Sequence, residues 1–318
     1  MKILFVNNKT INCGVYQYGK RVGKILSPRL SFFHYCEVVS LEEFLNLKDN
    51  YDIIVFNYIA AGRSNAPLGW LDQEILEELK GSGVKVGTVG HLNDVKFNFD
   101  FILSQYPSDQ LRDDSRYYIF RPLPFDMVEN PYIKNRRELD LIKRKVPRIG
   151  SFGFASKSKG FTGLIRIINS EFSKAEIRFH IASADYSDPT GEGTNNLISE
   201  CKAIKTKSGI SLNITSGFVD DESILDFLSG NDLNVFNYDD NEDGGVSSVI
   251  DFAISSGAPF AVSRSRMFRH VLENCLVIDK GLVNALREEE KFNDFFMKKW
   301  SHEAFTDRFL SIMEIIAN

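Results

Sequence analysis

The sequence has few cysteines, no long apolar run and no excess of positive charge. The four cysteines, Cys13, Cys36, Cys201 and Cys275, are far apart and form no C-x-x-C pair, which argues against a disulfide framework and a zinc knuckle. No apolar run approaches the ~20 residues that a membrane-spanning helix needs, and the run at residues 3–6 is too short for a signal peptide. We therefore expect a cytoplasmic protein with reduced thiols.

Charge and composition exclude further classes of protein. Lys and Arg total 38 against 43 Asp and Glu, so the net charge of −5 does not suit a protein that coats nucleic acid. Hydrophobic residues make up 43% and charged residues 25%, which is typical of a globular chain and excludes a disordered tail or a collagen-like fibre. At ~100–200 residues per domain, a chain of 318 residues predicts about two domains.

Short apolar runs alternate with stripes of helical spacing in the first part of the chain. One stripe begins directly after Gly14, a second covers residues 41–45, and a third covers residues 71–79. The runs that predict strands are residues 3–6, 31–39, 51–58, 84–89, 101–104 and 117–120. This alternation predicts a parallel sheet with helices on both faces.

The alternation stops between residues 126 and 146 and then restarts. Strands are predicted at residues 148–154, 177–182, 210–218, 233–238 and 260–263, and helices at 161–168, 191–206, 221–228, 247–256 and 305–316. We therefore expect an N-terminal α/β domain over residues 1–130, a C-terminal α/β domain over 131–300, and a terminal helix over 301–318 that packs back on the first domain.

The interruption contains a basic stretch from Lys134 to Lys145, with six basic and two acidic residues. One interpretation is a solvated linker helix. The other is a patch that contacts anionic lipid headgroups or a charged acceptor, which would place the protein peripherally at the inner face of a membrane.

Three segments that join a strand to a helix have residues suited to anion binding. In the first, Gly14 lets the backbone approach a ligand, although the segment lacks the G-x-G-x-x-G of dinucleotide-binding proteins. In the second, Lys159 and Gly160 follow a loop of small residues at the mouth of a helix, where a lysine suits a diphosphate. A solvated surface lysine is the alternative.

The third segment is the most specific of the three. Two glycines and two serines, from Gly244 to Ser248, precede a helix and offer N–H and O–H donors to an anion, unless the serines only cap the helix. The strand before them places the segment at the carboxyl edge of a parallel sheet, where ligands bind. The acidic loop at residues 239–243 could bind a divalent ion, but we favour a site without metal.

In this order, the motifs resemble those of GT-B glycosyltransferases of the large, mostly retaining type that use nucleotide-sugars to build surface polysaccharides and glycolipids. Cys13-Gly14-Val15-x-x-Tyr18 resembles their amino-terminal glycine loop, and residues 152–160 resemble their G-R-x-x-x-x-K-G segment. Residues 244–259 resemble the segment that holds their E-x7-E signature. The similarity runs from residue 2 to about 270. It implies an α/β, GT-B fold of two Rossmann-like α/β/α domains that face each other across a cleft.

The resemblance also implies a donor site on the second domain. The base and ribose of the donor are expected near Phe218 and Tyr238, and its diphosphate near Lys159. The other residues expected to bind the donor are Gly14, Lys157, Asp243, Gly245, Val246, Ser247 and Ser248.

The acceptor is expected on the first domain, near Gly14, Tyr16 and Arg63. His91 matches a family histidine that meets the donor sugar, and we count it with Lys159 and Asp251 as a candidate catalytic residue; a satisfied loop histidine is the alternative. In such retaining enzymes the leaving phosphate helps to deprotonate the acceptor, so the protein stabilises charge and aligns the substrates.

The sequence departs from the family pattern at two places. Phe154 stands where the family has a phosphate-binding arginine, which leaves Lys159, and with it Lys157, to meet the diphosphate. Asp243 and Asp251 keep the spacing of the acidic pair, but Gly257 follows Asp251 by six residues where the family has five. In the other register, Phe252 takes the second acidic position and the serines bind the phosphates.

The sequence therefore predicts a metal-independent enzyme that moves a sugar from a nucleotide-diphosphate-sugar, most readily a UDP- or GDP-sugar, to a saccharide or lipid-linked acceptor, without another cofactor. Three alternatives stay open: a catalytically silent GT-B scaffold that binds a nucleotide-sugar or a partner, a sugar-nucleotide epimerase, and a glycosyltransferase acting on nucleic-acid bases. The acidic net charge disfavours nucleic acid as a partner, and the oligomeric state is not predicted.

Overall fold

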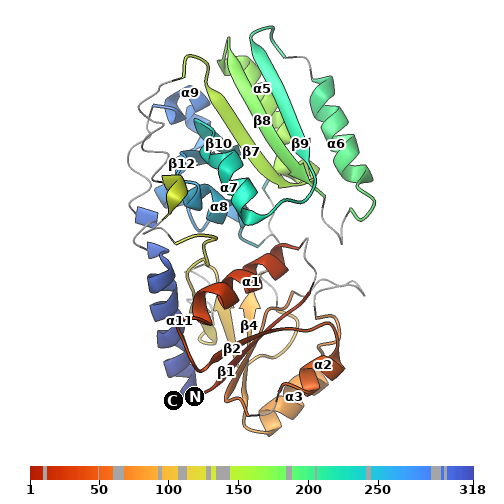
Figure 1. Cartoon of the computed structure of the whole chain (residues 1–318), viewed down its shortest axis with the longest axis vertical. Helices are drawn as coiled ribbons and strands as arrows, with labels where there is room; N and C mark the ends of the chain where they lie inside the picture. Colours follow the sequence, from red (N-terminus) through yellow and green to blue (C-terminus); the bar gives the residue numbers. More distant parts are fainter. Residues whose placement is uncertain are drawn as a thin grey trace. The chain divides into compact units, whose positions relative to one another are not determined.

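The computed structural model describes residues 1–9, 13–48, 50–59, 68–91, 95–106, 113–126, 130–133, 144–183, 188–204, 206–240, 245–287, 295–296 and 299–318. The polypeptide forms two compact units, and in the described part each unit contains one six-stranded parallel sheet (Figure 1). The first unit comprises Met1–Pro122, Asp243–Val246 and His302–Asn318, and the second comprises Leu123–Glu242 and Ser247–Ser301.

The sheet of the first unit is built around buried apolar strands. Its order is β2 (Phe33–Glu37), β1 (Ile3–Asn7), β3 (Ile53–Phe56), β4 (Lys85–Gly90), β5 (Phe101–Ser104) and β6 (Arg116–Tyr118). The main helices of this unit are α1 (Gly14–Leu26), α2 (Leu41–Leu45), α3 (Gln73–Gly81) and α11 (His302–Ala317).

Alternate residues of β1 show how both faces of this sheet are covered. Ile3 and Phe5 pack in one cluster with residues of α1 and α11, whereas Leu4 and Val6 pack in another with residues of α2 and α3. Successive side chains of a strand point to opposite faces, so a strand buried on both faces consists of continuous apolar residues. The predicted arrangement of a parallel sheet between two layers of helices is confirmed.

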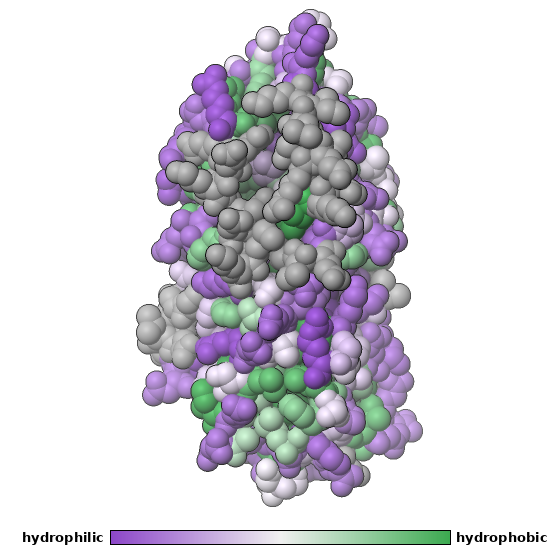
Figure 2. Space-filling model, turned by 60° about the vertical axis from the view of Figure 1, so that its left-hand side comes forward, coloured by the Kyte–Doolittle hydropathy of each residue, from purple (hydrophilic) through white to green (hydrophobic). Residues whose placement is uncertain are grey.

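The terminal helix α11 completes one of these layers. Phe305, Phe309 and Met313 are fully buried in the core that α11 shares with α1, and the Phe309 ring meets Phe33 edge to face at 5.6 Å. The opposite side of the helix is solvent-facing: Ile315 is 56% exposed. Figure 2 shows hydrophobic side chains gathered on the lower part of the face drawn there. Within the described residues, no helix combines the length and apolar character that a membrane crossing requires.

The second unit repeats the same plan. Its strand order is β12 (Leu276–Val277), β11 (Phe260–Val262), β10 (Leu233–Phe236), β7 (Arg148–Phe154), β8 (Ala175–Ala182) and β9 (Ile210–Ser216). Its main helices are α5 (Phe161–Glu171), α6 (Glu192–Ala203), α7 (Asp221–Ser229), α8 (Val249–Ser255) and α9 (Leu282–Ala285), and the one-turn helix η2 spans Lys157–Lys159.

Helices again cover both faces of this sheet. Ile149 of β7 lies in the cluster that contains residues of α5, α6 and α9. Phe152, on the other face of the same strand, meets Phe252 of α8 with ring centroids 5.3 Å apart. The helix expected at residues 247–256 begins at Val249, and the sequence did not predict β12 or α9, because two and four residues are too short to produce a periodic pattern.

Candidate functional site

The carboxyl end of the second sheet holds a lysine above an aromatic ring. After β7 the backbone turns through η2 to Gly160, whose φ of +64° favours glycine. A Cβ at this position would lie only 1.7 Å from the Asn237 carbonyl oxygen, so the two backbone segments are in close contact. The Asp239 amide also donates to the Ser158 carbonyl at 2.8 Å. These close contacts fix the turn against the segment that follows β10.

The turn brings Lys159 over Tyr238, with the ammonium nitrogen 3.8 Å from the ring centroid. Burial lowers the pKa of Lys159 to about 8. Among the described residues, no carboxylate forms an ion pair with this ammonium. The aromatic face is therefore the main described partner of a partly desolvated positive charge, an arrangement that attracts an anion.

Ser247 lies beside the same ring. Burial raises the pKa of Tyr238, and the Ser247 hydroxyl next to its oxygen acts in the opposite direction. Ser248 occupies the cap position of α8, but its side chain makes no capping hydrogen bond. We call Lys159, Tyr238 and Ser247 the lysine cluster. Ser248 is the next residue after Ser247, and its hydroxyl does not cap the helix.

Other residues predicted to bind the donor lie outside this cluster. The Lys157 side chain is 83% exposed and pairs with Glu200 of α6 at 3.1 Å. Phe218 follows β9 and is 44% exposed. Asp251 lies in α8 with no exposed surface through which to contact a ligand in this structure. Gly245 and Val246 are half-buried just before Ser247, and Asp243 lies outside the described residues.

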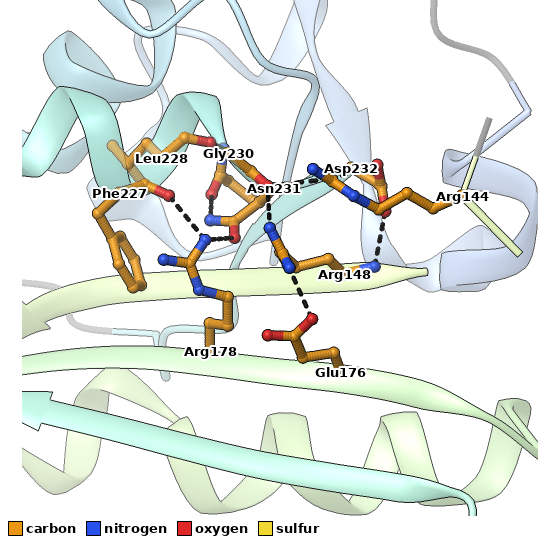
Figure 3. A network of polar contacts seen from close by, with 10 residues as sticks. Arg144, Arg148, Glu176, Arg178, Phe227, Leu228, Gly230, Asn231 and Asp232 are labelled. Carbon is orange, nitrogen blue, oxygen red and sulfur yellow. Dashed lines mark hydrogen bonds and ion pairs between the residues drawn. The ribbon is translucent and has the colours of Figure 1, made fainter. Parts of the chain in front are cut away.

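The opposite, amino-terminal end of this sheet carries cations that are paired (Figure 3). The Arg148 guanidinium donates to Glu176 at 2.8 Å, and its backbone amide donates to Asp232 at 2.7 Å. Arg144 pairs with Asp232 at 3.1 Å, and Arg178 donates to an Asn231 side chain at 3.0 Å. These contacts tie β7 and β8 to the residues that precede β10, which is a structural role.

The carboxyl end of the first sheet holds His91, directly after β4. Its Nε2 lies 2.6 Å from Asn57 Oδ1 and its Nδ1 lies 3.2 Å from Gln105 Nε2. The ring meets Tyr18 edge to face at 5.1 Å. Burial, with the Arg121 guanidinium nearby, lowers the pKa of His91 to about 3, so the imidazole is neutral at physiological pH.

Buried amides continue from His91 across the sheet. Asn57 Nδ2 donates to Asn7 Oδ1 at 2.7 Å, and Asn7 Nδ2 donates to the Tyr35 hydroxyl at 2.8 Å. Tyr35 in turn donates to the Glu37 carboxylate at 2.7 Å. We call the linked residues the polar row: Glu37, Tyr35, Asn7, Asn57, His91 and Gln105. They come from, or directly follow, β2, β1, β3, β4 and β5, in the order of the sheet.

The predicted acceptor-binding residues lie near one end of the polar row. Tyr16 is buried; its carbonyl oxygen accepts from Asn7 at 3.1 Å, and its hydroxyl faces Glu37. Gly14 opens α1, and apart from its chain neighbours and its own helix no described atom lies within 4 Å of the position a Cβ would take, so the described residues leave a ligand room to approach the backbone. Arg63 lies outside the described residues.

The sequence analysis did not identify most of the polar row. A signal was present, because Asn7, Asn57 and Gln105 each come at the end of a strand or one residue beyond it, after an almost uninterrupted apolar run. A polar side chain at this place reaches the carboxyl edge of a parallel sheet. Among the described residues, no group of three His, Cys, Asp or Glu side chains could hold a metal ion.

Solved structures share this fold along the whole chain. A glycosyltransferase from Rickettsia africae ESF-5 superposes with a TM-score of 0.70 at 12% identity, over 99% of this chain and 98% of that one. The Anabaena protein Alr3699/HepE in complex with UDP and glucose gives 0.66 at 12% identity, over 99% of each chain. OtsA in its apo form gives 0.63 at 12% identity, over 98% and 99%.

The chain therefore has the GT-B fold of glycosyltransferases, as the motif order predicted. No protein-family model matches the sequence, and a sequence search of curated proteins finds no match either. At 12% identity the likeness establishes the architecture, so the activity has to be argued from the residues of the site.

Proposed function

We propose that this protein is a glycosyltransferase that moves a sugar from a nucleotide-diphosphate-sugar to a saccharide or lipid-linked acceptor, in the synthesis of a surface polysaccharide or glycoconjugate. The observation that carries the proposal is Lys159, a partly desolvated ammonium with no described carboxylate partner at the carboxyl edge of a parallel sheet. A diphosphate is the anion that this position suits in a GT-B fold.

The donor binds to the second unit. Lys159 contacts the diphosphate, and the hydroxyls of Ser247 and Ser248 donate to its oxygens. Phe218, the exposed aromatic residue after β9, offers a face for the base. The support for a uridine nucleotide is that HepE, which has the same fold, was crystallised with UDP and with UDP-glucose.

The reaction needs stabilisation of the charge that develops on the departing diphosphate. Lys159 supplies a positive charge without a metal ion, and a low local polarity strengthens its attraction for the leaving group. We propose a retaining transfer in which this leaving phosphate accepts the proton of the acceptor hydroxyl. The first unit binds the acceptor near Gly14 and Tyr16.

The setting that we propose is the cytoplasm, at the inner face of a membrane. The basic stretch from Lys134 to Lys145 would contact anionic headgroups there; residues 134–143 of this stretch lie outside the described part of the protein.

The test is a panel of UDP-, GDP- and ADP-sugars, each followed by thermal shift and by nucleotide release with and without candidate saccharide acceptors. We expect one nucleotide class to raise the melting temperature and to be hydrolysed slowly or transferred. If no nucleotide-sugar stabilises the protein, the proposed function is wrong. Stabilisation without turnover, under every acceptor tried, would favour the silent scaffold.

A further inference from the structure

The hydrogen bonds of the polar row run in one direction, which the backbone determines. Asn57 Nδ2 donates to the Val15 carbonyl oxygen at 2.6 Å, and Asn7 Nδ2 donates to the Tyr16 carbonyl oxygen. A carbonyl oxygen can only accept, so the nitrogen of each amide must face its carbonyl. The amide oxygens then face the other way, and Asn57 Oδ1 faces His91.

This orientation decides which nitrogen of His91 carries the hydrogen. Asn57 Oδ1 accepts, so Nε2 of the imidazole must donate. Because the ring is neutral, Nδ1 holds a lone pair and accepts from Gln105. That contact, at 3.2 Å, is longer than the other links of the polar row, which measure 2.6 to 2.8 Å.

The far end of the polar row reinforces the direction. Burial keeps the pKa of Tyr35 above its usual range, so its hydroxyl stays a donor. The Glu37 carboxylate can only accept while it is ionised, and no described cation forms an ion pair with it. Hydrogen bonds in such a series polarise one another, so the negative end increases the acceptor strength of Asn57 Oδ1.

Helix α1 is shaped to fit this row. A Cβ on Gly19 would lie 2.5 Å from Asn7 Cγ and Oδ1 and 2.6 Å from Asn57 Nδ2, and a Cβ on Gly23 would lie 2.7 Å from the Tyr35 ring. Glycine within a helix costs about 0.5–1 kcal/mol relative to alanine. Two glycines four residues apart, both facing the polar row, therefore mark close packing against these particular side chains.

We propose that Asn57 is a positioning residue for His91, supported by Asn7, Tyr35 and Glu37. It holds the hydrogen of His91 on Nε2, so Nδ1 is the nitrogen that is left to accept a hydrogen bond from the sugar that the family resemblance places at this histidine. A hydroxyl of this sugar takes the place of the Gln105 amide, the longest contact in the row. This proposal rests on the proposed function, and it makes His91 a hydrogen-bond acceptor rather than an acid or base.

The test uses the whole 318-residue chain labelled with ¹⁵N-histidine. The chain has five histidines. The His91 signal is identified by its loss in a His91→Gln variant. We expect Nε2 to be protonated and Nδ1 unprotonated at pH 7, with no titration of this ring down to pH 5. A hydrogen on Nδ1, or an imidazolium at pH 7, would overturn the proposal.

The decisive variant is Asn57→Asp, which keeps the acceptor for His91 and adds a negative charge. We expect the pKa of His91 to rise by about 2 or more. A dependence of kcat/KM on pH should then appear around pH 5, with kcat/KM there about 10-fold below that of the wild type. Asn46→Asp, on the exposed end of α2 in the same unit, is the matched control and should leave the His91 signal unchanged.

An unchanged pKa of His91 in Asn57→Asp would contradict the proposal. Should that variant fail to fold, Tyr35→Phe removes the link between Asn7 and Glu37 with little change of shape. It should move the His91 Nε2 proton resonance and raise the KM of the sugar substrate about 3-fold; no change in either would overturn the proposal. The NMR measurement does not depend on activity. If the wild type binds no nucleotide-sugar, the proposed function is wrong, but the tautomer of His91 still shows whether Asn57 positions its ring.

Discussion

The carboxyl ends of the two sheets occupy equivalent places in similar units but differ in electrostatic character. The polar row of the first unit is a closed set of neutral amides and an imidazole that hydrogen-bond to one another, with its one carboxylate held by tyrosines. The lysine cluster of the second unit holds a cation that only an aromatic ring accompanies among the described residues. Amides and an imidazole that are already hydrogen-bonded suit the alignment of hydroxyl groups, and a cation without a described carboxylate partner suits a phosphate.

Removal of the Lys159 charge should have the largest effect on this contrast. We expect Lys159→Met to weaken donor binding about 100-fold, because a charge-assisted contact in a partly desolvated place is lost. Lys157→Met, two residues away on the exposed side and paired with Glu200, is the control and should change the Kd less than about 2-fold. Isothermal titration with the nucleotide-sugar measures both. Equal losses in the two variants would refute the lysine cluster as the phosphate site.

A methyl group at Gly19 should disrupt the packing of α1 against the polar row. Gly19→Ala places a Cβ among Asn7 and Asn57, so we expect the free energy of unfolding to fall by about 2 kcal/mol. Gly81→Ala, at the end of α3 with open space around its Cβ position, should be neutral or stabilise by up to about 1 kcal/mol. Urea unfolding compares the two. A Gly19→Ala protein as stable as the wild type would show that the packing around the row is loose.

The ring of Tyr238 should matter more than its hydroxyl. Tyr238→Leu removes the aromatic face below the Lys159 ammonium and should weaken donor binding about 5- to 10-fold, because a cation–π contact contributes about 1 kcal/mol. Tyr238→Phe keeps the face and should stay within about 2-fold of the wild type. If the phenylalanine variant loses as much affinity as the leucine variant, the hydroxyl rather than the ring holds the site together.

The last effect concerns pH and is the smallest of the four near neutrality. The pKa of Lys159 is about 8 without donor, and a bound diphosphate raises it, so binding takes up a proton once the pH exceeds about 8. Donor affinity should be constant from pH 6 to 7.5 and then fall by up to about 10-fold per pH unit. His91 adds no step in this range because its pKa is about 3. Lys159→Arg should keep its affinity to pH 9, since a guanidinium stays charged; a fall of equal size would assign the titration to another group.

Much of the fold could be predicted from the sequence, because the fold depends on local patterns. Residues 3–6 and 53–56 are apolar without interruption, which indicates strands buried on both faces, and the stripe at Phe305, Phe309 and Met313 indicates one buried face of a helix. The segments without such a pattern escaped prediction: β12 has two residues and α9 has four.

The candidate site was only partly predictable. Lys159 could be singled out because a lysine before Gly160 at a helix start is a local signal. The difference between Lys159 and Lys157 could not, because two lysines of one turn look equivalent in a sequence and only the fold shows which one lies over Tyr238. The burial of Asp251 likewise depends on the helices and strands around α8.

The sequence by itself determined the repeated order of strands and helices, and with it the two parallel sheets, since apolar periodicity is a property of neighbouring residues. The tertiary structure alone decided the polar row, in which Glu37, Asn7, Asn57, His91 and Gln105 lie at or just after the ends of five strands and are separated by up to 98 positions along the chain (7 to 105). Their hydrogen bonds depend on the lateral order of the strands, which places the end of β1 between those of β2 and β3. That order is set by packing between distant segments, and no local pattern records it.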